Sequence, residues 1–523
     1  MNKPLKLLFI SAFFNALCWM ILIPIWQYPD EQAHFAQVQN VAELGKVPTV
    51  GNNTSYEIAL SEKILGTDRN GFGNNKYTYH PEYNIPYSEN STGLFEKDFS
   101  NLPQESRTDL VKREATLNPP LYYLLGSFAY RITFDGSLFD RIFAVRFLSA
   151  LIFLATIFLA FNIGKIIFRK DKFLPIILTL LISFMPMLVF SSTGILPDPL
   201  TNLLFTLVLF LSLKLIKSGF NKNTLILTCV TIFLGVLTRQ QFLISLLIVL
   251  LAIVYNLVKK PQFIKITLIT LVIFTIFIII SNTLAVGLPI ITNFRIAELS
   301  SLGIQQFTIS SFANYFVWTL KHTFAEVWPW YWGVYKWLSL TLPPVYYQII
   351  NRLVIVALFG VLLKIIADIK SKKFKQESIY FYTLIIVSAI YFLIMTLWDY
   401  FFHIKNGYSF GIQGRYFFSL IVAHLAILLT GLQYISRVIL KKYSKYAIFT
   451  TAFVMIIFND LTLYHVSGSY YDTSSLHNFI IQASQYKPTL LKGPTILLIV
   501  TVNLTLQSCL VYYLGKYVLK KVN

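Results

Sequence analysis

The stretch LLFISAFFNALCWMILIPIWQYPDEQAHFAQVQNVAELGKVP, residues 7–48, decides the fold. Residues 7–25 contain no charged side chain and are long enough to cross a bilayer as a helix. Because they lack a small-residue cleavage site, we interpret them as a retained membrane anchor rather than a removable signal peptide. The segment after Pro29 then places apolar residues at helical spacing and stops at Gly45, which predicts a short amphipathic helix on the membrane surface.

Two adjacent carboxylates, Asp30 and Glu31, lie where this first membrane helix meets water, and His34 follows four residues after Asp30. Charged groups at the edge of the membrane cost free energy, which favours a functional role. We therefore interpret the pair as the candidate reactive centre of a polytopic membrane enzyme. Two simpler readings stay open. Asp30 could only cap the following helix, and His34 could be a packed histidine.

The composition is that of an integral membrane protein: of 523 residues, 55% are hydrophobic and only 13% are charged. The net charge of +20 suggests nucleic acid at first sight. However, the basic residues cluster in short loops between apolar runs, as the orientation rule for membrane proteins predicts, so we expect no nucleic-acid partner. All three cysteines fall inside apolar runs, which gives no sign of a disulfide framework.

With the N-terminus in the cytoplasm, the apolar runs predict an all-α integral membrane protein with about 12 (11–13) transmembrane helices and both termini inside. Amphipathic interfacial helices are expected in two outer loops, 27–118 and 286–346. Residues 118–134 look too short to span and are expected to dip into the outer leaflet. The expected spans are 6–25, 141–168, 173–190, 198–217, 223–238, 241–258, 263–285, 347–369, 379–398, 415–437, 446–464 and 495–519.

This topology brings further charged residues to the same outer face: Arg141, Arg146, Asp198, Arg239, Asp399, His403 and Arg415. Acids beside arginines at one membrane face suggest a site for a negatively charged ligand next to a general base. Asp198 could instead only begin a helix, and Arg146 and Arg415 could be snorkelling anchors. Arg239 lies between two apolar runs, where a buried cation needs a partner or an anionic ligand.

Several familiar enzyme classes lack their motifs in this chain. The sequence contains no HEXXH, no GxxxxGK[ST] loop and no GxSxG elbow, so a zincin protease, a P-loop NTPase and an α/β-hydrolase are unsupported. Soft metal-ligand clusters are also lacking.

Six motifs in order resemble the polytopic GT-C glycosyltransferases, in particular the group of protein O-mannosyltransferases and lipid A aminoarabinose transferases. They cover most of residues 1–260 and the stretch 411–420. The motifs are PDEQAHF with AELGKVP, NPPLYYLL, RFLSAL, FMPMLVFSSTGILPDPL, GVLTRQQF and QGRYFF.

The resemblance implies a division into a GT-C transmembrane module, residues 1–285 with outer loop 27–118, a second outer loop, 286–346, and C-terminal transmembrane helices, 347–523. It implies a plasma-membrane enzyme that transfers a hexosyl or pentosyl unit, with inversion, on the extracytoplasmic face. The donor would be a polyprenyl-phosphate sugar and the acceptor the hydroxyl of a glycan, lipid or protein. Cell-envelope glycosylation would be the context.

For the site, the resemblance implies that Asp30 is the base, with Glu31 as the second catalytic candidate. Asp198 matches the second outer-loop aspartate of the family, and Arg239 stands where the family has a lysine. The common H-P-P-L reads Asn118-Pro119-Pro120-Leu121 here. The substrate-binding candidates are His34, Arg146, Asp198, Arg239 and Arg415.

No cofactor is firmly expected, although Asp30 and Asp198 could hold a divalent metal through hard oxygen ligands. Two other functions stay open. A cell-envelope polysaccharide polymerase or ligase would use a late outer loop, where His403 and Arg415 lie. A lipid or sugar transporter would place its charges near the bilayer midplane and show repeated halves.

Overall fold

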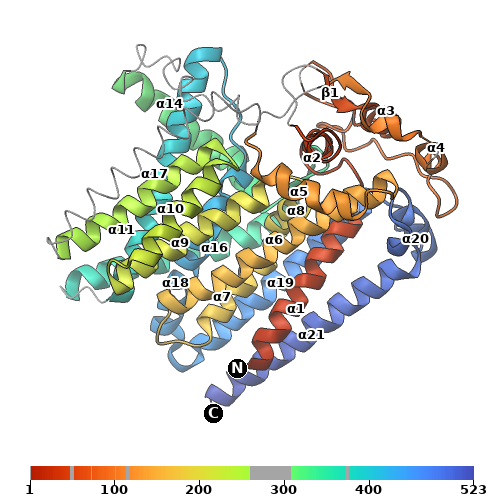
Figure 1. Cartoon of the computed structure of the whole chain (residues 1–523). Helices are drawn as coiled ribbons and strands as arrows, with labels where there is room; N and C mark the ends of the chain where they lie inside the picture. Colours follow the sequence, from red (N-terminus) through yellow and green to blue (C-terminus); the bar gives the residue numbers. More distant parts are fainter. Residues whose placement is uncertain are drawn as a thin grey trace.

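The computed structural model describes residues 2–46, 52–71, 73–100, 102–113, 118–259, 308–371 and 376–522. The predicted span 263–285 and residues 286–307 of the predicted second outer loop lie outside these ranges. Within them the chain is a bundle of long apolar helices with a smaller cap at one end (Figure 1). This confirms the prediction of an all-α integral membrane fold.

The bundle contains eight helical stretches that are long and apolar enough to cross a membrane among the described residues, or nine if a bent pair counts as one. The stretch Gly414–Gly468 itself holds two long helices, and Lys222–Val236 is a shorter apolar helix. The predicted count of about twelve stays a prediction. The helices are α1 (Asn2–Leu22), α6 (Leu138–Ile167), α7 (Leu174–Ser183), α8 (Pro186–Thr193), α9 (Asp198–Ser218), α10 (Lys222–Val236), α11 (Ser245–Lys259), α16 (Pro344–Ser371), α17 (Gln376–Asn406), α18 (Ile421–Leu440), α19 (Ser444–Gly468) and α21 (Pro494–Val522).

The run predicted to span at 173–190 is broken. Its two halves, α7 and α8, meet at an angle of 59°. Pro186 is the first residue of α8, where a missing N–H leaves no helical hydrogen bond unmade, so the proline starts a new helix rather than continuing the old one.

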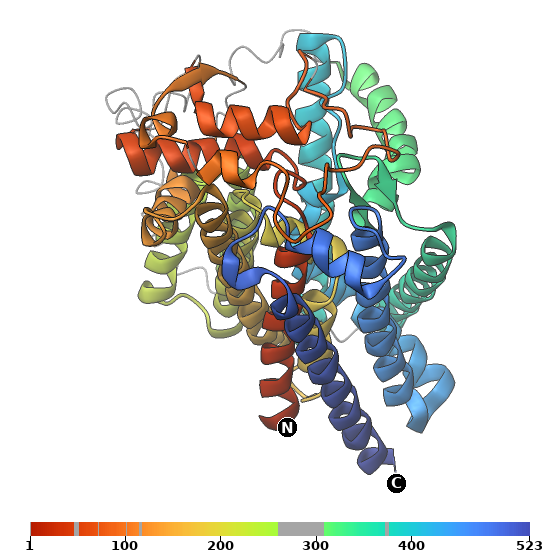
Figure 2. The ribbon, with the colours of Figure 1, turned by 90° about the vertical axis from the view of Figure 1, so that its right-hand side faces the viewer.

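The cap consists of residues 31–113 and lies over one end of the bundle, whereas both termini lie at the other end (Figures 1 and 2). Its sheet is a single antiparallel pair in which Thr54 faces Val111. The elements of the cap are α2 (Glu31–Leu44), β1 (Asn52–Ser55), α3 (Tyr56–Leu65), α4 (Glu96–Ser100), a 3₁₀ turn (Gln104–Arg107) and β2 (Leu110–Lys112).

Helix α2 forms and ends at Gly45 as predicted, with that glycine in the left-handed conformation at φ 66°. Its position at the membrane surface stays a prediction, but the exposed polar face that the amphipathic pattern indicated is absent, because twelve of its fourteen residues are buried. The rest of the cap covers one side, and α5 (Leu121–Ile132) covers another. Its glutamines and asparagines contact the cap instead of water, as when Asn40 Nδ2 donates to the carbonyl of Asn53.

Helix α5 lies within the 118–134 segment whose crossing was in question. Its twelve residues rise about 18 Å, well short of the ~30 Å hydrocarbon core, so this helix does not cross the membrane by itself. It packs between α2 and α6.

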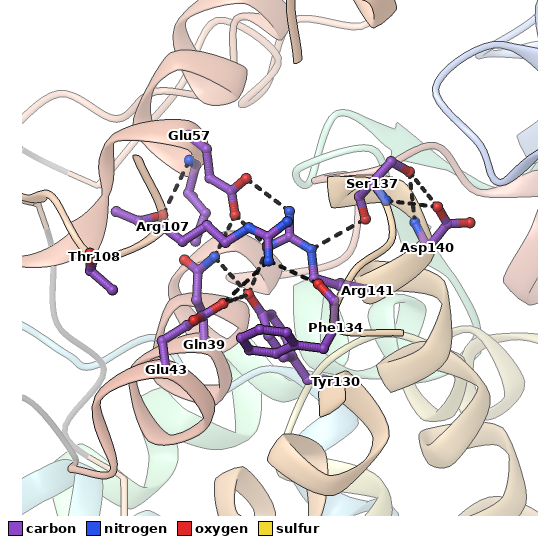
Figure 3. Close-up of polar contacts among 12 residues, drawn as sticks. Gln39, Glu43, Glu57, Arg107, Thr108, Tyr130, Phe134, Ser137, Asp140 and Arg141 are labelled. Atoms are coloured by element: carbon purple, nitrogen blue, oxygen red, sulfur yellow. Dashed lines mark hydrogen bonds and ion pairs between the residues drawn. The ribbon is translucent and has the colours of Figure 1, made fainter. Parts of the chain in front are cut away.

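A buried ion-pair network fastens the cap to the bundle (Figure 3). Arg141 of α6 makes a bidentate pair with Glu57 of α3, with nitrogen–oxygen distances of 2.7 and 2.9 Å. The hydroxyl of Tyr130 accepts a third bond from Arg141 and donates to Glu43 of α2. Arg141, which was expected at the outer face, therefore connects the cap to the bundle through buried hydrogen bonds.

The remaining described elements are short and lie between the bundle helices along the chain. They are α14 (Ile309–His322), a π turn (Thr323–Val327), α15 (Trp328–Trp332), β3 (Val334–Tyr335), β4 (Leu340–Thr341) and α20 (Leu476–Ser484), with 3₁₀ turns at Gln240–Ile244, Gly414–Leu420, Lys441–Tyr443 and Thr489–Leu491.

Candidate active site at the junction of bundle and cap

Asp30 lies at the junction between α1 and the cap. Its backbone is left-handed at φ 57°, and its side chain makes no capping hydrogen bond to α2. The simple capping explanation therefore does not apply. Instead, Oδ1 lies 2.9 Å from Nη2 of Arg69 and Oδ2 lies 3.7 Å from Nη2 of Arg415. The side chain is 36% exposed, so a ligand can still reach the carboxylate.

The charges around Asp30 keep it ionised. Burial acts to raise the pKa of this carboxyl, but the cations of Arg69 and Arg415, with smaller contributions from His34 and Arg239, outweigh burial and leave the pKa below its usual value. A carboxylate at this position is present throughout the neutral range.

Arg415 reaches the site from the 3₁₀ turn that precedes α18. Gly414 makes this approach possible, since a Cβ there would lie 2.3 Å from the backbone nitrogen of Tyr331. The arginine side chain is only 6% exposed. Its Nε and Nη1 are buried and have no hydrogen-bond partner among the residues that the structure describes.

Asp198 and Arg239 form a second charge pair at the site. Asp198 is the first residue of α9, Arg239 follows α10, and Nη1 of the arginine lies 2.8 Å from Oδ1 of the aspartate. Arg239 thus has the carboxylate partner that its position between apolar runs required. Both residues act electrostatically on His34, as do Asp30 and Arg415, and we refer to these five side chains as the Asp30 cluster.

His34 is a neutral member of this cluster. Burial is the largest influence on its ring and lowers its pKa to about 4, although Asp30 and Asp198 act in the opposite direction. Its Nδ1 lies 2.9 Å from the hydroxyl of Tyr123, which belongs to the NPPLYYLL motif. The ring of His34 is therefore a buried hydrogen-bonding group that carries no charge at neutral pH.

Glu31 and Arg146, both candidate site residues, lie in a separate and sealed pair. Each side chain is 0% exposed. Arg146 uses all five of its N–H donors: two bonds go to Glu31, and the others go to the carbonyls of Met20, Ile23 and Pro24. No nitrogen of this guanidinium is left for a substrate.

The same glutamate connects two segments that carry the site. Oε2 of Glu31 accepts the backbone N–H of Trp26, and Oε1 accepts that of Ile195, at 3.0 and 3.4 Å. Ile195 lies three residues before Asp198. The sealed pair thus holds the turn of Asp30 beside the turn of Asp198.

Two further residues at the site carry no strong signal in the sequence. Arg69 comes from a Gly- and Asn-rich turn of the cap, and its guanidinium lies 5.1 Å from the ring centre of Trp337. Trp337 donates its indole N–H to the carbonyl of Trp26. It lies in three consecutive left-handed residues, Lys336 to Leu338. Such backbone strain persists only where the surroundings enforce it.

Asp399 and His403 have contacts of another kind. Asp399 accepts hydrogen bonds from the hydroxyls of Tyr315 and Ser409 and from the backbone N–H of Phe410. The ring of His403 packs against Tyr315. Asp399 therefore shapes the loop that leads to Gly414, and these contacts do not involve the Asp30 cluster.

The donor set at the site does not fit a resident metal. No three His, Cys, Asp or Glu side chains gather in a metal-binding arrangement within the described ranges. Asp30 and Asp198, the two candidate ligands, each contact an arginine, which occupies the carboxylate that a cation would need. We derive no step through a metal.

Comparisons with known proteins give a family and a distant fold similarity. No curated protein matches the chain. Among solved structures, the chain is similar to the oligosaccharyltransferase AglB from Archaeoglobus fulgidus in complex with an inhibitory peptide and a dolichol-phosphate, at 13% identity, 90% of this chain, 56% of that chain and a TM-score of 0.45. It is also similar to ArnT from Cupriavidus metallidurans bound to undecaprenyl phosphate, at 13% identity, 96% and 76% coverage and a TM-score of 0.37.

The chain spans little more than half of the length of the archaeal enzyme. Residues 13–424, most of the chain, match a family model described as a predicted membrane protein, DUF2142. On that match the chain belongs to the DUF2142 family of predicted membrane proteins.

Proposed function

We propose that this protein is a membrane glycosyltransferase that moves a sugar from a polyprenyl-phosphate-linked donor to the hydroxyl of a glycan, lipid or protein acceptor. The observation that carries the proposal is the buried guanidinium of Arg415, two of whose nitrogens have no acceptor within the described structure. A buried cation of this kind is expensive unless a ligand supplies acceptor oxygens. A phosphate next to the accessible carboxylate of Asp30 would supply them.

The chemistry assigned to Asp30 is the removal of a proton. As the acceptor hydroxyl transfers its proton to this carboxylate, its oxygen bonds to the anomeric carbon. The bond from that carbon to the phosphate oxygen breaks, and the electron pair leaves with the polyprenyl phosphate. An in-line displacement of this kind inverts the anomeric centre, and a positioned base typically contributes about 10²–10⁴-fold.

The arginines supply the other half of the reaction. The leaving phosphate is already a stable anion and needs no strong general acid. Arg415 and Arg239 stabilise the negative charge that grows on it, with Asp198 orienting Arg239. Arg69 orients the carboxylate of Asp30, and the neutral ring of His34 offers a hydrogen bond to the sugar. Glu31 and Arg146 act as positioning residues through the backbone.

We assign the cap to the extracytoplasmic side of the plasma membrane. Helices α6 and α9 begin near the cap, as the contacts of Arg141 and Asp198 require, so their basic ends at 165–172 and 214–217 lie toward the end of the bundle that holds both termini. Basic loops favour the cytoplasm. This orientation supports transfer on the outer face.

Binding of undecaprenyl phosphate to the purified protein in nanodiscs tests the proposal. Wild type should bind it, and Arg415→Gln should weaken binding about 10–100-fold, since a hydrogen bond to a charged group contributes about 1.5–3 kcal/mol. The matched control is Arg437→Gln, because Arg437 ends α18, the helix that follows the Arg415 turn, with a side chain that is 58% exposed. A wild-type protein that does not bind the lipid would contradict the proposal.

A further inference from the structure

A cavity of about 420 Å³ lies in the cap next to the Asp30 site. Its walls come from α2, β1, α3, β2 and the turn after α3, and seven of the residues that line it are polar or charged: Gln32, Thr54, Glu62, Arg69, Asn70, Lys112 and Arg113. The proposed mechanism of sugar transfer assigns no role to this cavity. It is formed by the cap, whereas Arg239 and Arg415 come from the bundle.

Arg69 connects the cavity to the reacting carboxylate. It lines the cavity, and its Nη2 lies 2.9 Å from Oδ1 of Asp30. The other oxygen, Oδ2, faces Arg415. One side of Asp30 therefore contacts the arginine proposed to hold the donor phosphate, and the other oxygen contacts Arg69, which separates the carboxylate from the cavity.

Two buried groups in the cavity wall point to a polar occupant. Oε1 of Gln32 is buried and has no hydrogen-bond partner among the residues described, and the buried Oε2 of Glu62 has only the longer contact of 3.5 Å with Nε of Arg113. The residues themselves are 2% and 4% exposed. Such acceptors are normally satisfied, so a ligand bearing hydroxyl groups would complete them.

The charged side chains in the cavity wall indicate whether the ligand carries a positive or a negative charge. Three cations line the cavity: Arg69 is paired with Asp30, Arg113 lies 3.5 Å from Glu62, and Lys112 adds a positive charge for which no carboxylate lines the cavity. An excess of positive charge in a cleft attracts an anion.

From these contacts we infer that the cavity is the acceptor subsite and takes an anionic sugar, one that carries a carboxylate or a phosphate along with its hydroxyls. This inference rests on the proposed glycosyl transfer. The anionic group contacts Lys112 and Arg113, hydroxyls donate to Gln32 and Glu62, and the reacting hydroxyl reaches Asp30 past Arg69.

The experiment measures sugar binding to the full-length protein in nanodiscs saturated with undecaprenyl phosphate. The probes are methyl β-D-glucuronide and the neutral methyl β-D-glucoside, followed by saturation-transfer NMR. We expect the glucuronide to bind at least 10-fold more tightly than the glucoside. Lys112→Gln with Arg113→Gln should weaken glucuronide binding at least 10-fold while undecaprenyl phosphate binding stays unchanged.

The matched control removes two positive charges from the cap outside the cavity, Lys63→Gln with Lys97→Gln, and should bind the glucuronide as wild type does. Because Arg113 pairs with Glu62, Lys112→Gln alone is the second variant: this side chain is exposed, and its loss should weaken binding about 3-fold without disturbing the fold.

Glu62 gives an independent readout. Burial raises its pKa to about 7, against the opposing effects of Arg113 and Arg69, while Asp68 adds to the rise. As the pH rises from 6 to 8, Glu62 ionises and repels the glucuronide, so binding should weaken about 3-fold. Lys112, Arg113 and Arg69 are the other charged groups that line the cavity, and Glu62→Gln should remove the pH dependence.

The outcomes separate this inference from the proposed function. Equal binding of both sugars, wild-type binding by the Lys112/Arg113 variant, or an unchanged pH dependence in Glu62→Gln overturns the acceptor subsite and leaves glycosyl transfer standing. Failure of wild type to bind undecaprenyl phosphate overturns glycosyl transfer itself.

Discussion

Asp30 and Glu31 are adjacent in the chain, yet their carboxylates lie in opposite surroundings. Asp30 is partly exposed between two arginines, one of which keeps two nitrogens without acceptors in the described structure. Glu31 is sealed with Arg146, whose five donors are all used. Charge alone therefore does not mark a functional residue in a membrane protein. The useful distinction is whether the surrounding protein already satisfies the charge.

The largest expected effect concerns Asp30, the carboxylate that is partly exposed. Asp30→Asn keeps the size of the side chain and removes the base, so transfer should fall about 10²–10⁴-fold. The melting temperature should change little, because Asp30 makes no capping bond to α2. Initial rates with a polyprenyl-phosphate sugar donor, together with thermal unfolding, measure both. A variant with normal rates would remove Asp30 from the mechanism.

Substitutions in the buried Glu31–Arg146 pair should change the stability of the fold rather than the rate of transfer. Arg146→Gln leaves the carboxylate of Glu31 buried without its partner, which should reduce the free energy of unfolding by about 3–5 kcal/mol. Replacing both residues by methionine should recover much of that loss, since the buried pair is then absent. Arg415→Gln serves as the contrasting variant and should unfold close to wild type. Similar destabilisation by Arg415→Gln and Arg146→Gln would break the comparison.

The smallest effect concerns pH. The lowered pKa of Asp30 means that its ionised form, and with it the maximal turnover rate, should persist from pH 8 down to at least pH 5. Arg69→Gln removes the largest influence that lowers this pKa. The pKa should rise, so the base becomes protonated and activity is lost at a higher pH than in wild type. If activity is lost at the same acidic pH in Arg69→Gln as in wild type, Arg69 does not lower the pKa of Asp30.

The sequence was sufficient for the features that depend on local pattern and hydrophobic length. It predicted the all-α membrane fold, the helix that ends at Gly45 and the start of a helix at Asp198. It also predicted that Arg239 needs a partner, because a cation between apolar helices is unfavourable wherever the rest of the chain goes.

What the sequence could not supply depends on contacts between distant residues. The amphipathic pattern of α2 indicated one solvent-exposed face, but other parts of the cap cover that face. The sequence of residues 31–44 alone does not show which segments pack there. Asp30 and Glu31 are adjacent carboxylates at the start of α2, and only the positions of α6 and α8 decide which of them is sealed. Arg69 lies in a turn without periodicity and reaches the site only because β1, β2 and α3 place the turn there.

The Glu31–Arg146 pair also sets an order for the biosynthesis of the protein. Its partners are 115 residues apart in the chain, and Arg146 additionally binds the carbonyls at the end of α1. At about 5–20 residues per second, ribosomes need roughly 6–23 s to make the intervening chain. During that interval the glutamate at the end of the first anchor has no counterion, so it must stay hydrated at the edge of the translocation channel. Docking of α6 is then the event that desolvates Glu31 and fixes Asp30 beside it, which makes the assembly of the proposed active site a post-insertion step.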